Sequence, residues 1–392
     1  MKILFVTPEI PSSSGGGAQR MLFMMKYLSN LGAEIHLLSL AAQNSPLAEI
    51  RNWCKDLHLV ERKERFRDKA KNLIFFRAYT FFPKFESAVR EFNLSDFDLI
   101  HVQKFQMAEY FRKVKKVPVV IDLWACGLSG SWYEFFYEKN FSRKLVKLSR
   151  IPRFYLSDIR YYRSFKYFFV VSKEAKEYIL KRYPEKKVYI VPTGIESEKT
   201  SQTRVELEKK KHNLVFSGDM GFFQNIDTVG YFAKRIFPLI KKKIKDAKFF
   251  IVGKNPAKKV IKLAKKDADI VVTGFVKDIS VYLRNASVFV APIRTGSGIR
   301  TKILEAMASS LPLVTSKRAT EGIEAENGKN LLMARTPLEF AHHVVDLLNH
   351  PQKQVKIGEA GKKLIQEKYQ WETISKDIMA FYHDILKDFH SR

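Results

Sequence analysis

The chain has 392 residues, which is too long for one ordinary hydrophobic core and predicts two domains. Its composition, 46% hydrophobic and 28% charged, excludes collagen-like and low-complexity proteins and is typical of a soluble globular protein. Sixty-nine Lys and Arg against 41 Asp and Glu give a formal charge of +28, which indicates anionic partners: nucleic acid, phosphorylated ligands or acidic lipid. A generally lysine-rich host is the alternative.

Cysteine content and hydropathy predict a cytoplasmic protein. Cys54 and Cys126 are the only two cysteines, which favours a reduced protein over a disulfide framework, and neither lies in a CxxC pair that could hold zinc. No apolar run reaches the roughly 18–20 residues that a membrane span needs. The first residues, MKILFVTPEI, predict a strand and not a signal peptide.

The chain begins with a predicted strand, glycine loop, helix and strand: Lys2–Thr7, Gly15, Gly16 and Gly17, Ala18–Leu31, and Ile35–Leu40. This unit does not match a dinucleotide-binding fingerprint, because Arg20 takes the place of the third glycine and the second strand lacks a following acidic residue. The three glycines still allow a ligand to approach the backbone closely; a plain turn is the alternative.

Residues 61–90 interleave Arg and Lys with seven aromatic residues: Phe66, Phe75, Phe76, Tyr79, Phe81, Phe82 and Phe85. Rings beside cations suit an anionic membrane surface, so we predict peripheral attachment to the inner face of the membrane here. Two alternatives are helices whose aromatic faces belong to the core, and a surface for single-stranded nucleic acid. Because no RNP-like, KH-like or zinc-finger pattern is present, nucleic acid is not expected as a partner.

Two further strands are predicted at Leu99–Val102 and Val119–Asp122, and they carry His101 and Asp122. Open α/β sheets bind ligands at the carboxyl ends of their parallel strands, which makes both residues candidates for catalysis. A structural role is the alternative, above all for a single histidine. A long basic helix is expected over Arg143–Ser164.

A polar stretch follows Gly194, and we place a domain boundary near residues 195–211, between a first domain of residues 1–195 and a second of residues 196–370. The second domain repeats a strand–glycine–helix pattern and predicts a six-stranded parallel sheet, with Gly218, Gly274 and Phe275 beside a ligand. Apolar residues then follow at helical spacing: Trp371, Ile374, Ile378, Phe381 and Ile385. They predict a helix in residues 371–392 that crosses back to the first domain.

The sharpest signal lies between Val288 and Ser309. A buried strand, Val288–Ala291, leads through Gly296-Ser297-Gly298 into a helix that begins at Arg300. Unpaired amides, the positive end of a helix dipole, and the cations Arg300 and Lys302 together predict an anion site. Glu305 lies three residues after Lys302 on the same side of the helix and could hold a sugar hydroxyl. A capped helix with a surface Lys–Glu pair is the alternative.

Motifs along the whole chain resemble those of GT-B glycosyltransferases of family 4. They are PEIPSSSGGGAQR, VVSKEAKEYIL, VPTGIE, IVGKNP, VTGFVKDI and VAPIRTGSGIRTKILEAMASSLPLVTSKRATEGI. The resemblance implies an α/β fold with two Rossmann-like parallel-sheet domains facing across a cleft. It also implies a retaining, metal-independent transfer of sugar from a nucleotide-diphosphate donor to a glycan or lipid-linked acceptor, in cell-surface polysaccharide or glycolipid synthesis. No cofactor is expected.

The resemblance also assigns roles to residues. Glu305 would hold the donor ribose, while Gly298, Ile299 and the start of the helix would take the diphosphate. Arg300 and Lys302 would neutralise the diphosphate as it departs. The loop of Gly15, Gly16 and Gly17 would approach it from the other domain on closure.

The chain departs from the family pattern at three places. Ser297, also expected at the donor, stands where the family has a glutamate that pairs with Glu305. Trp124 replaces a histidine, which leaves the contribution of the first domain to Asp122 or His101. The family's Arg and Lys are absent from SGDMGFFQNID. Two alternative functions therefore stay open: a non-catalytic protein that binds nucleotide or polysaccharide, and a nucleotide-sugar epimerase.

Overall fold

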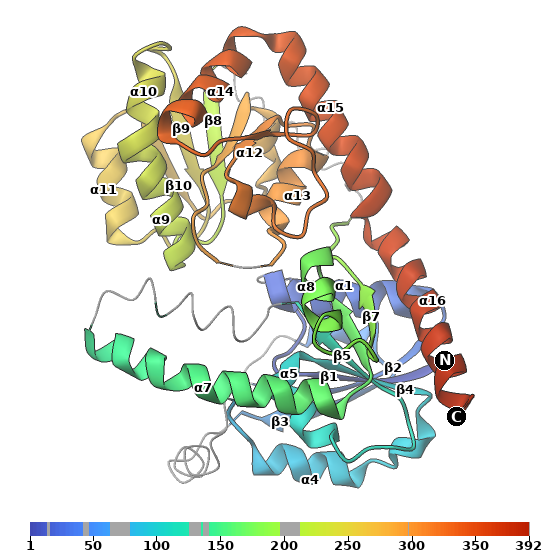
Figure 1. The fold of residues 1–392 in the computed structure, drawn as a ribbon. Helices are drawn as coiled ribbons and strands as arrows, with labels where there is room; N and C mark the ends of the chain where they lie inside the picture. Colours follow the sequence, from blue (N-terminus) through green and yellow to red (C-terminus); the bar gives the residue numbers. More distant parts are fainter. Residues whose placement is uncertain are drawn as a thin grey trace. The chain divides into compact units, whose positions relative to one another are not determined.

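The computed structural model of the protein describes residues 1–13, 16–41, 47–62, 79–124, 135, 141–196, 212–296 and 298–391, without the side chains of residues 142 and 143. They form two compact units (Figure 1). One unit combines Met1–Thr193 with Trp371–Arg392, and the other is Gly194–Gln370. Each is built on a parallel sheet, so the predicted α/β class with two parallel-sheet domains is confirmed.

The first unit contains a seven-stranded sheet in the order β3-β2-β1-β4-β5-β6-β7. Its strands are β1 Lys2–Thr7, β2 Glu34–Ala41, β3 Asp56–Glu61, β4 Leu99–Gln103, β5 Val119–Leu123, β6 Tyr167–Val170 and β7 Lys187–Ile190. Every residue of β4, β5 and β6 is buried. Strands that are buried over their whole length are typical of a parallel sheet covered on both faces.

Alternate residues of β1 enter two different cores. Ile3 and Phe5 pack with α1 (Gly16–Asn30) and α16 (Trp371–His390), whereas Leu4 and Val6 belong to the core that contains residues of the other helices. Those helices are α4 Pro83–Glu91, α5 Lys104–Ala108, α7 Phe141–Ser164 and α8 Lys173–Leu180. The short helices α2 Ala48–Arg51, η1 Leu94–Asp96 and η2 Glu109–Phe111 complete this unit.

The C-terminal helix α16 is an integral part of the first core. Trp371, Ile374, Ile378 and Ile385 are buried, as the sequence pattern predicts. At the remaining position the buried residue is Tyr382, while Phe381 is only partly buried. The buried face of α16 therefore includes Tyr382 and not Phe381, because the Tyr382 hydroxyl forms a hydrogen bond with His101 inside the unit.

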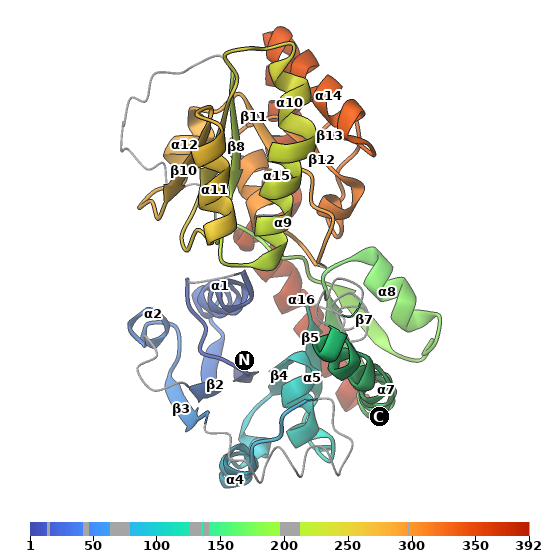
Figure 2. The same cartoon turned by 90° about the vertical axis from the view of Figure 1, so that its left-hand side faces the viewer.

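The second unit contains a six-stranded parallel sheet in the order β10-β9-β8-β11-β12-β13. The strands are β8 Asn213–Ser217, β9 Lys248–Val252, β10 Ile270–Gly274, β11 Val288–Ala291, β12 Leu313–Thr315 and β13 Leu332–Met333. The helices are α9 Phe223–Tyr231, η3 Phe232–Ile236, α10 Phe237–Lys241, α11 Lys258–Lys266, α12 Ser280–Arg284, α13 Thr301–Ala308, η4 Lys317–Thr320, α14 Pro337–Asn349 and α15 Pro351–Lys368. Figure 2 shows α9 and α11 side by side over this sheet.

The aromatic segment at residues 61–90 is only partly described, because residues 63–78 lie outside the described ranges. Phe82 and Phe85 are 5% and 0% exposed and belong to the core of the first unit. The predicted membrane role is therefore wrong for these two rings, because α4 packs them inward. Among the described helices, none has both the length and the apolar character needed to cross a bilayer.

Candidate active site

The predicted anion site lies at the carboxyl end of the second sheet, where β11 leads through a glycine loop into α13. Gly296 and Gly298 have φ values of +95° and +84°, a region that favours glycine. Helix α13 begins after Arg300, whose extended backbone caps the helix without a side-chain hydrogen bond. Amides of a first helical turn have no partner inside the helix, so this end can receive an anion.

The amino group of Lys302 lies at the end of β8, where three neighbouring residues determine its position. It donates to Asn225 Oδ1 at 2.6 Å and lies 4.4 Å from the centre of the Phe216 ring. A Cβ atom on Gly218 would lie 2.4 Å from Lys302 Nζ. The glycine at this strand end therefore leaves the space that the lysine needs.

Burial changes the ionisation of both candidate donor-binding side chains on α13. It lowers the pKa of Lys302 to about 7, although the nearby Glu305 carboxylate favours the charged amine. Burial also raises the pKa of Glu305, an effect that Lys302 opposes. The two groups are therefore close enough to interact, and desolvation raises the free energy of their charged forms. This combination is typical of a site that binds a polar ligand.

The parallel strands β8 and β9 are paired to their ends, and the backbones of the two glycines that follow them are in contact. A Cβ atom on Gly253 would lie 1.8 Å from the carbonyl oxygen of Gly218, so only glycine fits there. After these two glycines, Asn255 Nδ2 donates to the Asp219 carboxylate at 3.1 and 3.3 Å. Asn225 Nδ2 donates to the Asp219 carbonyl at 2.7 Å. This linked set fixes the amide that holds Lys302.

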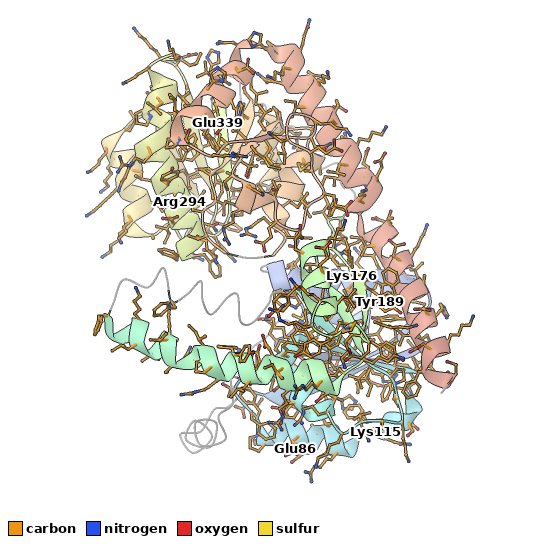
Figure 3. All side chains as sticks on the ribbon, viewed as in Figure 1. Glu86, Lys115, Lys176, Tyr189, Arg294 and Glu339 are labelled. Carbon is orange, nitrogen blue, oxygen red and sulfur yellow. The ribbon has the colours of Figure 1, made fainter. Side chains whose placement is uncertain are left out.

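The arginines around the glycine loop are bound to backbone carbonyls or to a carboxylate of the protein. Arg300 donates to the carbonyl oxygens of Gly298 and, at 3.3 Å, Thr295. Arg318 donates to Gly296 O at 3.2 Å. Arg294, labelled in Figure 3, pairs with Asp227 at 2.6 Å. Arg300 is thus engaged with its own loop and would have to exchange these carbonyls for a diphosphate.

Two buried hydroxyl groups adjoin these glycines without a hydrogen-bond partner in the described part of the chain. They are Ser217 Oγ, before Gly218, and Thr295 Oγ1, before Gly296. Buried polar atoms normally have a hydrogen-bond partner. An unpaired one near the end of a strand therefore suits a position where a bound ligand supplies the missing hydrogen bond. Ile299, in contrast, packs against the second core, which leaves its backbone as the part available to a ligand.

Other predicted donor residues lie at the end of β10, which is paired with β9. Gly274 ends β10 with a φ of +71°, and a Cβ atom there would meet nothing within 4 Å. Phe275 follows it and is 73% exposed. Two further exposed rings, Phe222 and Phe223, lie at the start of α9. Gly15 and Ser297 lie outside the described residues.

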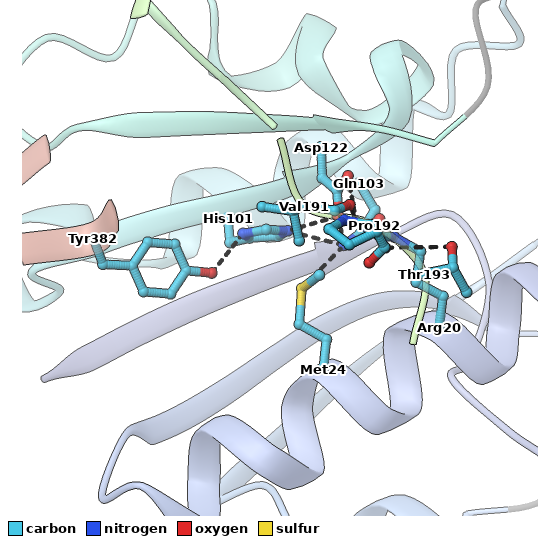
Figure 4. A network of polar contacts seen from close by, with 9 residues as sticks. All are labelled: Arg20, Met24, His101, Gln103, Asp122, Val191, Pro192, Thr193 and Tyr382. Carbon is cyan, nitrogen blue, oxygen red and sulfur yellow. Dashed lines mark hydrogen bonds and ion pairs between the residues drawn. The ribbon is translucent and has the colours of Figure 1, made fainter. Parts of the chain in front are cut away.

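In the first unit, Asp122 and His101 belong to a closed polar network (Figure 4). Arg20 Nη2 contacts the two Asp122 oxygens at 3.2 and 3.1 Å. Gln103 Nε2 donates to Asp122 Oδ2 at 3.0 Å and lies 2.9 Å from His101 Nε2. The Tyr382 hydroxyl lies 2.7 Å from His101 Nδ1. Asp122 and His101 are both 0% exposed.

The ionisation of the network suits a permanent ion pair. Burial alone would raise the pKa of Asp122, but the Arg20 guanidinium and the bonds from its neighbours hold it below its usual value. Burial lowers the pKa of His101, although Asp122 acts in the opposite direction. A neutral His101 beside a paired Asp122 is the arrangement expected of a structural cluster, which is the alternative left open for both residues.

Trp124 covers the start of α1. A Cβ atom on Gly17 would lie 2.0 Å from the Trp124 ring, so the indole rests directly on the glycine backbone. Lys104 Nζ lies 4.0 Å from the centre of the same ring, and Lys104 has an uncommon positive φ of 65°. Gly16 meets nothing within 4 Å of an added Cβ. This corner combines a cation, an aromatic face and an exposed helix start.

No three of the His, Cys, Asp and Glu residues that the structure describes lie close enough together to hold a metal ion. The cations available at the α13 site are side chains of the protein.

Two family models match successive parts of the chain. The one described as Glycosyltransferase Family 4 matches residues 14–199, and the one described as Glycosyl transferases group 1 matches residues 211–350. Both models describe glycosyltransferases, so the predicted resemblance to this group of proteins is confirmed.

Solved structures show the same fold along nearly the whole length of this chain. Sucrose-phosphate synthase from Thermosynechococcus elongatus has 15% identity and a TM-score of 0.71, over 99% of both chains. Anabaena HepE, solved in complex with UDP and glucose, has 14% identity and a TM-score of 0.67, over 98% of this chain and 100% of that one. The predicted GT-B fold is thereby confirmed.

A curated relative of this chain is an uncharacterized 44.6 kDa protein in the cps region of Klebsiella pneumoniae. It is 22% identical over 173 residues, which are 42% of this chain. The match spans 45% of the relative, which is less than half of its length.

Several residues that build these two sites are not evident from the sequence motifs. Asn225 holds Lys302 from 77 positions away, Arg20 pairs with Asp122 across 102, and Lys104 lies over Trp124. None of these residues is part of a motif that signals its role. For Arg20, the one available signal was a charged residue at a position where dinucleotide-binding loops have glycine.

Proposed function

We propose that the protein is a retaining glycosyltransferase that moves a sugar from a nucleotide-diphosphate donor to a glycan or lipid-linked acceptor. The observation that carries this proposal is the position of Lys302. Its amino group lies beside Glu305 at the unpartnered start of α13, with a pKa lowered to about 7 by burial. Such a group gains most from a bound anion, because the anion compensates the cost of its charge.

Each element of the site has a chemical task in this proposal. The first-turn amides of α13, together with Lys302, receive the diphosphate, and Glu305 accepts hydrogen bonds from the ribose hydroxyls. As the bond to the sugar breaks, negative charge grows on the departing phosphate oxygen. A cation fixed in advance stabilises that charge without reorganisation, which lowers the barrier.

The same proposal includes metal independence, a cytoplasmic location and a role in cell-surface polysaccharide or glycolipid synthesis. The cationic side chains of the site support metal independence, because they can supply the positive charge that a divalent metal supplies in other enzymes. The relative in a cps region supports the role in cell-surface polysaccharide or glycolipid synthesis. The HepE complex with UDP and glucose makes UDP-sugars the first donors to test.

A panel of UDP-, GDP- and ADP-sugars tests donor binding through the thermal midpoint of the purified protein. Binding to the folded state alone raises stability by about 2.7 kcal/mol at a hundredfold excess over the dissociation constant. We expect one nucleotide series to raise the midpoint and the others to leave it unchanged. No shift with any nucleotide would contradict the donor site.

Turnover separates the transferase from the two alternatives. We expect release of the nucleoside diphosphate and, with an acceptor, an α-linked product from an α-linked donor, measured by proton NMR and unchanged by EDTA. Donor binding without any turnover would favour the non-catalytic alternative. An epimerised nucleotide sugar in the absence of acceptor would favour the epimerase.

A further inference from the structure

Helix α7 presents an apolar stripe to solvent. Its exposed large apolar residues include Phe141 (75%), Leu145 (51%), Leu148 (43%), Tyr155 (53%) and Leu156 (52%). At helical spacing they fall within about 100° of the helix circumference and extend over roughly 22 Å of its length. Pro152 is exposed and lies in the same sector. A continuous stripe of this kind on a surface marks an interaction site.

The other face of α7 anchors the helix to the first unit. Tyr161 and Tyr162 are buried, and Tyr161 stacks on Phe105 with the ring centres 5.1 Å apart. Phe154 meets Tyr79 edge to face at 5.3 Å. None of the described residues from 141 to 150 is buried. The C-terminal half therefore fixes the helix, and the N-terminal half extends from it (Figure 1).

The charge along α7 is of one sign. Its described basic residues are Lys144, Lys147, Arg150, Arg153, Arg160 and Arg163. Its single acidic residue, Asp158, is buried. Every exposed charge on the helix is therefore positive. An apolar stripe with cationic margins matches the interface of an anionic bilayer, where apolar side chains enter the acyl boundary and cations meet the headgroups.

We propose that α7 docks the protein on an anionic membrane surface through the stripe of Phe141, Leu145, Leu148, Tyr155 and Leu156. This surface differs from the segment at residues 61–90, whose described rings Phe82 and Phe85 are core. The proposal is independent of the transferase activity, because membrane binding is measured without donor or acceptor.

Co-sedimentation with vesicles tests the proposal on the full chain. We expect binding to vesicles of phosphatidylglycerol and phosphatidylcholine, little binding to phosphatidylcholine alone, and weaker binding at high salt, because salt screens the electrostatic part. Absence of binding to the anionic vesicles would overturn the proposal. Equal binding to both kinds of vesicle would do the same.

A matched pair of double variants locates the surface. Leu145→Glu with Leu148→Glu places charge in the stripe, and we expect vesicle binding to fall at least about tenfold. Leu338→Glu with Val355→Glu makes the same change at two exposed positions of the second unit, 71% and 64% exposed, and should leave binding within about twofold. Equal loss in both variants, or in neither, would contradict the assignment to α7. Unchanged melting temperatures would show that both variants fold.

A gain-of-function variant gives an independent readout. Leu148→Trp keeps the stripe apolar, and its fluorescence should shift to the blue with vesicles and be quenched by brominated lipid beyond the wild-type signal. No additional quenching would overturn the proposal. Binding to single-stranded nucleic acid, or a concentration-dependent dimer, that is lost in the Leu145→Glu/Leu148→Glu variant while vesicle binding persists would assign the stripe to another partner.

Discussion

At the scale of single residues, the proposed donor site depends most on the ionisation of Lys302. Burial lowers its pKa to about 7, so the amine is charged below neutral pH and mostly neutral above it. A diphosphate beside the amine favours the charged form and raises that pKa again. In the proposed site, binding and protonation are therefore coupled, and we expect the affinity for donor to depend on pH.

The affinity for an intact nucleotide sugar should fall roughly tenfold between about pH 6 and about pH 8, since each pKa unit corresponds to about 1.4 kcal/mol. The affinity falls as the pH rises because the free protein must take up a proton to bind donor above pH 7 but not below it. Titration calorimetry in two buffers of different ionisation enthalpy would measure both the affinity and the proton uptake.

Replacing the lysine provides the control for this pH dependence. Lys302→Ala should lower transfer at least tenfold through lost charge stabilisation and should flatten the pH profile of donor affinity. Lys262→Ala removes an exposed lysine of α11 and should change neither. Wild-type rates in Lys302→Ala, or a pH profile that persists in it, would refute the role of the lysine.

At the scale of elements, two glycines bring β8 and β9 together below the site. Gly218 and Gly253 have φ values of +149° and +143°, and their backbones touch. The first contacts of an added Cβ differ between them. On Gly218 they are the ends of the Lys302 and Asn225 side chains, whereas on Gly253 they are backbone atoms of Gly218.

Gly253→Ala should therefore destabilise the protein by about 2–4 kcal/mol, because a backbone contact at 1.8 Å cannot be relieved without separating the strand ends. Gly218→Ala should cost less stability but should weaken donor binding, because it displaces Lys302. Urea denaturation and donor titration would measure the two effects. In Gly230→Ala, the matched control inside α9, nothing lies within 4 Å and stability should rise by about 0.5–1 kcal/mol. Equal effects at Gly218 and Gly253 would contradict this account.

At the scale of the whole molecule, the first unit is assembled from two distant parts of the chain around a buried ion pair. Arg20 binds Asp122 and also donates to Val191 O at 3.0 Å and Pro192 O at 2.7 Å. The Trp371 ring lies 6.0 Å from the same guanidinium. Both places where the chain leaves or re-enters this unit thus lie next to one arginine.

Asp122→Asn should destabilise the protein by about 3–5 kcal/mol, because it leaves the Arg20 charge buried without its counterion. Glu86→Gln breaks an exposed pair with Arg90, whose atoms are 3.0 Å apart, and should cost at most about 0.5 kcal/mol. Chemical denaturation would measure both values. A stable Asp122→Asn protein that binds donor but cannot transfer sugar would instead favour the predicted catalytic role of Asp122.

Most of the fold was predictable from local sequence because strands, glycine turns and amphipathic helices are encoded by neighbouring residues. The predicted strand Val288–Ala291 is present as predicted, and the predicted helix from Arg300 forms as Thr301–Ala308 with Arg300 as its cap. The edge strand β3 was missed because it is largely exposed and lacks an apolar run. Six strands were expected in the second sheet, but β13 was not located because two residues are too short to produce a pattern.

The sequence alone determined the two parallel sheets, the glycine loop before α13 and the grouping of Lys302 with Glu305, because each depends on residues a few positions apart. Only the tertiary structure decided the surroundings of His101 and Lys302, because their partners arrive from 281 and 77 positions away. It also decided which face of α7 is covered. The burial of a side chain, and with it the pKa and the available partners, is set by whatever distant segment packs against it.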